Sequence, residues 1–296
     1  MGKAPRLAIS AGIACLLWAC SSPDPIIGGD AHPAMWEVSD GDTTFTLIGS
    51  VHQLPPQLNW QDRRVLSAMA HSDELWLELA PREYAAIPAL FIAVSSDESV
   101  ASIDQRIGRA RAEQVIDQLN QIGIDEGDAQ AMESWAIAMS FGAVAGNDAG
   151  LARENGVEDV LTAAFQRTSR PIIGLESAAS QFAAFDALSP AVQDRMLAMA
   201  VDDAADTRPR LVRLLGAWAR GDFATFSRLV SVDVDRLPAL KQSVVTMRNR
   251  EWATRLDQRA RAPGRVMVAV GAGHMVGDDG LPALLRQAGF TVRRIP

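Results

Sequence analysis

Two histidines in this chain of 296 residues follow the same short pattern. The strings Gly-Ser-Val-His at 49–52 and Gly-Ala-Gly-His at 271–274 both have the form Gly-x-x-His, and each comes directly after an apolar run. A strand that ends at such a glycine presents the imidazole at its carboxyl end, where open α/β sheets bind ligands. Because the chain has only four histidines, we expect His52 and His274 to share one site.

Two imidazoles at neighbouring strand ends suit either metal binding or proton transfer. Both can ligate a divalent cation, or one can act as a general base. A catalytic metal centre needs a third ligand, usually a carboxylate, with water in the open position. Glu78, near the end of the strand predicted over residues 74–79, is the best candidate, although a solvated charge at a strand end explains it equally well.

Two further side chains are candidates for the same site. Glu176 ends another short apolar run and offers a second carboxylate, although a helix cap or an ion pair also explains it. Arg248 lies in the helix predicted before the last core strand. An arginine there can stabilise a developing oxyanion, or it can simply pair with an acid or with water.

Composition and motif searches exclude several functions. The formal charge is -8 and no basic stripe is present, so a nucleic-acid partner is excluded. The two cysteines provide no cysteine-based metal site. The sequence has no Gly-x-Ser-x-Gly string, no His-Glu-x-x-His string and no P-loop.

The amino-terminal segment predicts export and a lipid anchor. Residues 1–19 have the basic start and apolar stretch of a signal peptide, and Cys20 stands where a bacterial lipoprotein is cleaved and lipidated. An ordinary signal peptide cut near Ala19 is the alternative. Residues 20–34 predict a flexible tether. The sequence therefore predicts an exported lipoprotein that faces the periplasm, anchored in the outer membrane because Ser21 follows the cysteine.

The rest of the chain, residues 35–296, predicts a single α/β domain. Its order is hairpin, helix, strand, helical insertion, strand, helical block, strand, helix and strand. The insertion covers residues from about 81 to 170. This order predicts a mixed central β-sheet with helices packed on it and a helical cap.

Taken together, these strings resemble the TraB/GumN family, which also contains pheromone-shutdown (PrgY) proteins and TIKI-like, Wnt-cleaving metalloproteases. The resemblance extends over nearly all of residues 35–296. Besides the paired histidine strings, it rests on Leu-Glu-Leu at 77–79, Glu-Ser-Trp at 133–135, Gly-Val-Glu at 156–158, Gly-Leu-Glu at 174–176 and Arg-Asn at 248–249.

The resemblance implies a metal-dependent peptidase. On that basis His52, His274 and Glu78 would hold a divalent ion such as Mn, Co or Zn, with Arg248 as a polar neighbour. The substrate would be a peptide or a small ester. One departure weakens this assignment, because Ala80 stands where the family often has an aspartate.

Three alternatives to a metal-dependent hydrolase remain open. Glu78 and one histidine can activate water without a metal. The protein can instead bind haem or another ligand without turnover. A non-catalytic family member is the third possibility, since one architecture hosts unrelated functions.

Overall fold

A six-stranded mixed sheet forms the centre of the computed structural model, which describes residues 27–148 and 150–296. The predicted signal peptide and Cys20 lie outside the described residues. Along the sheet the strands follow the order β6 (Ile172–Glu176), β5 (Glu74–Leu79), β7 (Gly264–Gly271), β3 (Thr43–Ser50), β2 (Met35–Ser39) and β8 (Thr291–Ile295). A separate parallel pair joins β1 (Gly29–Asp30) to β4 (Leu58–Asn59).

The four strands β6, β5, β7 and β3 run parallel, whereas β2 pairs antiparallel with both β3 and β8. Their register aligns the ends of the parallel strands: Ser50 faces Gly271 across β3 and β7, and Leu79 faces Glu176 across β5 and β6. The carboxyl ends of four strands therefore meet at one edge, where ligand sites form in α/β proteins.

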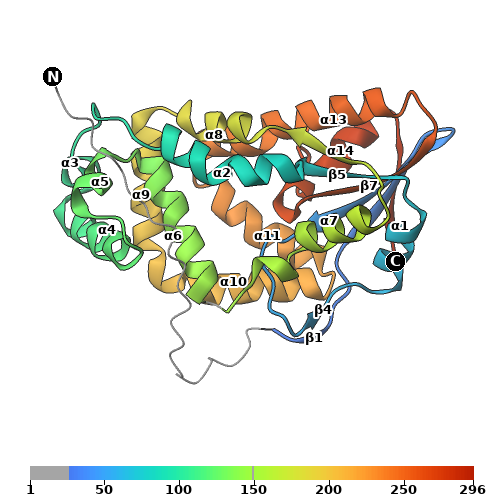
Figure 1. The fold of residues 1–296 in the computed structure, drawn as a ribbon, viewed down its shortest axis with the longest axis horizontal. Coiled ribbons are helices and arrows are strands. Elements are labelled where there is room, and N and C mark those ends of the chain that lie inside the picture. The colour runs from blue at the N-terminus through green and yellow to red at the C-terminus, as the bar shows by residue number, and fades with distance from the viewer. Residues whose placement is uncertain (1–26, 149) are drawn as a thin grey trace.

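Helices cover both faces of this sheet (Figure 1). One face packs on α1 (Arg63–His71), α7 (Val157–Arg167) and α10 (Ala204–Ala219). The other packs on α13 (Arg248–Arg259) and α14 (Leu281–Gln287). Successive residues of β7 alternate between the two cores, as the pleat of a strand requires. The sequence prediction of an α/β fold with a mixed central sheet is confirmed.

A third apolar core lies within a group of helices beyond the strand ends, on the left of Figure 1. Its members are α2 (Pro81–Val94), α3 (Ile103–Ile107), α4 (Arg109–Gln121), α5 (Glu126–Ala131), α6 (Ser134–Asp148), α8 (Ala178–Asp186) and α9 (Pro190–Asp202). Trp135 is fully buried at its centre and packs against Phe91 and Phe182. Burying one such aromatic side chain contributes on the order of 2–3 kcal/mol.

The remaining elements are helical. They are η1 (Arg153–Asn155), α11 (Phe223–Val234), α12 (Pro238–Lys241), the π-helix η2 (Gln242–Met247) and η3 (Ala272–Met275). The π-helix runs directly into α13, and π-turns of this kind are frequent at functional sites. Among the described residues, no helix is both long and apolar enough to cross a bilayer.

Candidate functional site

The two Gly-x-x-His strings touch each other at the strand edge. A Cβ atom on Gly49 would lie 2.9 Å from the Cα of Ala272, so the first string accommodates the second only because it carries glycine. A Cβ on Gly271 would lie 3.0 Å from Oε1 of Glu78. The glycines therefore let the strand ends and the Glu78 carboxylate approach closely.

Glu78 is buried, and both of its carboxylate oxygens accept hydrogen bonds. The backbone N–H of Gly271 donates to Oε1 at 2.6 Å. Arg248 Nη2 donates to Oε2 at 2.7 Å, and Gln181 Nε2 donates to the same oxygen at 3.2 Å. Burial opposes ionisation of this carboxyl, but the neighbouring His274 and Arg248 outweigh it and lower the pKa of Glu78 to about 2.

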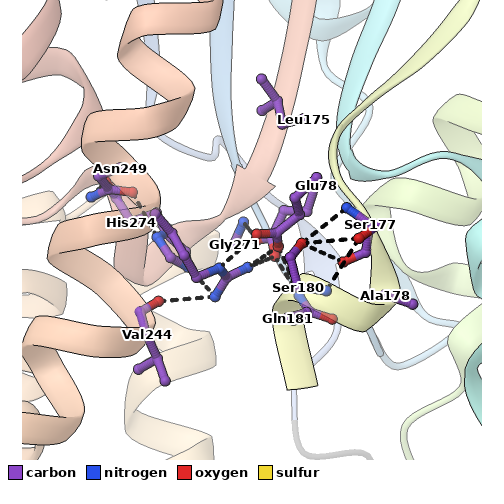
Figure 2. A network of polar contacts seen from close by, with 12 residues as sticks. Glu78, Leu175, Ser177, Ala178, Ser180, Gln181, Val244, Asn249, Gly271 and His274 are labelled. Carbon is purple, nitrogen blue, oxygen red and sulfur yellow. Dashed lines mark hydrogen bonds and ion pairs between the residues drawn. The ribbon is translucent and has the colours of Figure 1, made fainter. Parts of the chain in front are cut away.

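Figure 2 shows the network of polar contacts around Glu78 and His274. Arg248, which contacts both of these residues, starts α13 directly after the π-helix. Its guanidinium bridges Glu78 and Glu176, donating to Glu176 from Nε at 3.0 Å and from Nη2 at 2.5 Å. Burial raises the pKa of Glu176, against the hydrogen bonds from Arg248. The Arg248 side chain is 11% exposed and both carboxylates are 5% exposed, so this is a buried ion network.

His274 is buried, with both ring nitrogens in hydrogen bonds. Its Nδ1 lies 2.7 Å from Oδ1 of Asn249, whose amide nitrogen donates to two backbone carbonyl oxygens. That amide arrangement leaves Oδ1 as an acceptor, so Nδ1 of His274 carries the proton. The lone pair on Nε2 then faces Nη1 of Arg248, at 3.3 Å. Burial lowers the pKa of His274 to about 4, so the ring is neutral at neutral pH.

His52 has a different environment. Its side chain is 62% exposed, and its Nδ1 lies 2.8 Å from Oε1 of Glu158, which is 4% exposed. Ser50 Oγ donates to the same carboxylate oxygen at 2.5 Å and fixes it in place. The charge of Glu158 raises the pKa of His52 to about 9, so the ring is an imidazolium at neutral pH.

His52, Glu78 and Glu158 line one cavity of about 590 Å³. That volume suits a small organic ligand or a short peptide. Strand ends and the start of α7 supply the polar side of the cavity, and the helices supply apolar side chains. Oε2 of Glu158 is buried and has no hydrogen-bond partner among the described residues.

Tyr84 and Arg153 add hydrogen-bond donors to this cavity. The Arg153 guanidinium lies over the Tyr84 ring at 4.6 Å and pairs with Asp159 at 3.2 Å. Burial, followed by the charges of Glu158 and Glu78, raises the pKa of Tyr84, so its hydroxyl stays protonated.

The structure brings the predicted site residues to one edge of the sheet but divides them between two environments. Arg248, His274 and Glu78 form the buried network, whereas His52 faces the cavity and contacts Glu158. Sequence reasoning assigned no role to Glu158. The only signal was its position in the Gly-Val-Glu string at 156–158, because its partner lies 106 residues earlier in the chain.

The metal ligand set implied by the resemblance is not formed in this arrangement. The acceptor atoms of His274 and Glu78 receive hydrogen bonds from Arg248, Gly271 and Gln181, so a cation would have to displace the arginine. Across residues 27–148 and 150–296, no group of three His, Cys, Asp or Glu side chains is placed to hold an ion. Metal binding stays a prediction that this geometry does not favour.

These observations define an α/β protein whose cavity opens where the carboxyl ends of its parallel strands bring two Gly-x-x-His strings together. The chain belongs to the TraB/PrgY/gumN family, which matches residues 34–294. The family predicted from the sequence is therefore confirmed.

Two proteins similar to this chain are both called "Uncharacterized protein YbaP". The one from Escherichia coli (strain K12) is 28% identical over 262 residues, which cover 86% of this chain and 92% of that protein. The one from Shigella flexneri is 27% identical over 262 residues, which again cover 86% of this chain and 92% of that protein. No solved structure matches the chain. The relatives support the family and supply no activity.

Proposed function

We propose that this chain is a hydrolase of the bacterial cell envelope that cleaves an ester or amide bond in the cavity beside His52. The observation that carries the proposal is the 2.8 Å contact between His52 Nδ1 and the buried carboxylate of Glu158. A carboxylate on one ring nitrogen orients the imidazole and leaves Nε2 for the reacting groups, as in histidine-based hydrolases.

In this proposal His52 moves the proton. The neutral ring accepts a proton from water at Nε2 while the water oxygen bonds to the substrate carbonyl carbon. The resulting imidazolium, stabilised by Glu158, then donates that proton to the leaving oxygen or nitrogen as its bond to the carbonyl carbon breaks. Because the pKa of His52 is about 9, the neutral base is a minor species at neutral pH.

Tyr84 is the donor proposed to bind the carbonyl oxygen as it gains negative charge, because the Arg153 guanidinium is already paired with Asp159. A protonated phenol in a largely apolar cavity stabilises such a charge more strongly than water does. Arg248 is a positioning residue here, because it does not itself line the cavity and its hydrogen bonds hold the carboxylates of Glu78 and Glu176.

Hydrolysis of a panel of chromogenic acyl esters and anilides by the full chain tests the proposal. We expect His52→Gln and Glu158→Gln to lower kcat by about 100-fold or more, because each removes a participant in proton transfer. His71→Gln is the matched control, since that exposed histidine ends α1 outside the cavity. Equal rates of hydrolysis for the wild-type chain and all three variants would refute the proposal.

The metal-dependent hydrolase implied by the resemblance is the alternative mechanism, and it has its own test. A chelator such as EDTA leaves the rate unchanged in the metal-free proposal. Loss of activity on chelation, with recovery on adding Mn, Co or Zn ions, would favour the alternative. Arg248 would then have to leave Oε2 of Glu78 and Nε2 of His274, two of the atoms that it now contacts.

The envelope location rests on the sequence of residues outside the described range. We propose that Cys20 is lipidated after removal of residues 1–19, and that the anchor holds the domain at the periplasmic face of the outer membrane. Mass spectrometry of the mature amino terminus tests this, with Cys20→Ser as the variant expected to leave the membrane fraction. An unmodified Cys20 in the membrane fraction would contradict it.

A further inference from the structure

We infer that the cavity beside His52 selects an uncharged carbonyl compound with an extended apolar chain, such as an acyl ester or acyl amide. This inference rests on the proposed function for the bond that is cleaved, but its binding claim stands separately. Two observations carry it, namely the side chains on the helical wall and the pairing of every charged group at the polar end.

Apolar side chains from several helices line the cavity, beside the polar Gln181 from α8 and Thr207 from α10. Ile87 from α2, Met139 from α6 and Phe182 from α8 belong to or pack against the core of the helical group. Leu211 from α10 and Leu151 face the same cavity from the core beside the sheet. The cavity therefore lies between two apolar cores, and a hydrocarbon chain placed there loses its contact with water.

The charged groups at the polar end are all paired. His52 contacts Glu158 at 2.8 Å and Arg153 contacts Asp159 at 3.2 Å. Glu78 contacts Arg248 at 2.7 Å. With each carboxylate matched to a cation, a charged ligand group would have to break an existing pair, whereas a neutral carbonyl needs only a hydrogen-bond donor.

The pairing of these charges also explains how the product would leave. Hydrolysis of an acyl ester converts the neutral carbonyl into a carboxylate, and among the described residues at this end of the cavity each cation is already paired. We therefore expect the substrate to bind more tightly than the carboxylate product of equal chain length.

Displacement of the uncharged fluorophore N-phenylnaphthylamine from the full wild-type chain tests the binding claim. Straight-chain methyl ketones serve as competitors because they keep the neutral carbonyl and cannot be hydrolysed. Their affinity should rise roughly fourfold per added methylene group until the cavity is filled. Fatty-acid carboxylates of the same length should bind more weakly.

Two substitutions on one helix locate the binding. Ile87→Trp fills the cavity from α2 and should weaken the longer ketones roughly tenfold or more. Ile92→Trp is the matched control, because Ile92 lies on the same helix, is 46% exposed and does not line the cavity. Leu211→Trp provides a second blocking variant on α10 if Ile87→Trp fails to fold, as checked by circular dichroism.

The outcomes separate this inference from the proposed function. Length-dependent ketone binding without hydrolysis would support the inference and leave the chain a binding protein. Hydrolysis of short esters without any gain from longer chains would support the proposed function and overturn the inference. Tighter binding of carboxylates, or equal binding in Ile87→Trp and Ile92→Trp, would also overturn it.

Discussion

Replacing Arg248 by methionine removes the cation from the buried network and leaves two carboxylates without their partner. Glu78 and Glu176 are each 5% exposed, so water does not compensate for the loss. Breaking a buried ion pair by removing one partner costs about 3–5 kcal/mol. We therefore expect Arg248→Met to lower the free energy of unfolding by that amount at neutral pH, a fall in Tm on the order of 10 °C.

Urea unfolding followed by tryptophan fluorescence measures this change. Arg250→Met is the matched control, because that exposed arginine lies two residues further along α13, and surface changes shift stability by about 0.5 kcal/mol or less. Adding Glu78→Gln and Glu176→Gln to Arg248→Met should recover most of the loss, since no buried charge then lacks a partner. Equal stability of the two single-arginine variants would refute the assigned role of Arg248.

Three further predictions concern the histidines and one glycine. The pKa of His52 is raised from 6.5 to about 9, so its contribution to stability is complete below 6.5 and is lost as the pH rises through about 9; Glu158→Gln should abolish this decline in thermal unfolding experiments. A histidine NMR titration should show His274 neutral and protonated on Nδ1 until the pH falls to about 4; an ordinary titration near 6.5 would contradict its buried environment. Gly271→Ala places a Cβ 3.0 Å from a buried carboxylate oxygen and should cost about 1–3 kcal/mol in urea unfolding. Gly41→Ala, with no atom within 4 Å, is its control, and a similar cost in both variants would count against the close contact.

The strand ends could be predicted from the sequence because the relevant signal is local. An apolar run followed by Gly-x-x-His marks where β3 and β7 end, and Glu78 lies one residue before the end of its strand. In an open α/β sheet the carboxyl ends of parallel strands lie at the same edge, so these strand ends are expected to lie together. The prediction that His52, His274 and Glu78 gather at one edge follows from these facts alone.

The partners of these residues could not be predicted, because they depend on tertiary packing. Nothing near Arg248 in the sequence indicates that it reaches Glu78, which lies 170 residues earlier. The sequence also does not show that His274 donates to Asn249 while His52 pairs with Glu158. Because of these contacts, two strings of the same pattern end in histidines with different properties. His274 is buried and neutral, whereas His52 faces the cavity and is charged.

The most direct test of the account is the pH dependence of kcat/KM for ester hydrolysis by the full chain in the presence of excess EDTA. If His52 is the base and no metal takes part, the rate survives chelation, rises about tenfold per pH unit and levels off near the pKa of His52, at about 9. A rate that disappears with EDTA, or that shows no change through this range, would contradict the central claim that the His52–Glu158 pair carries out the chemistry.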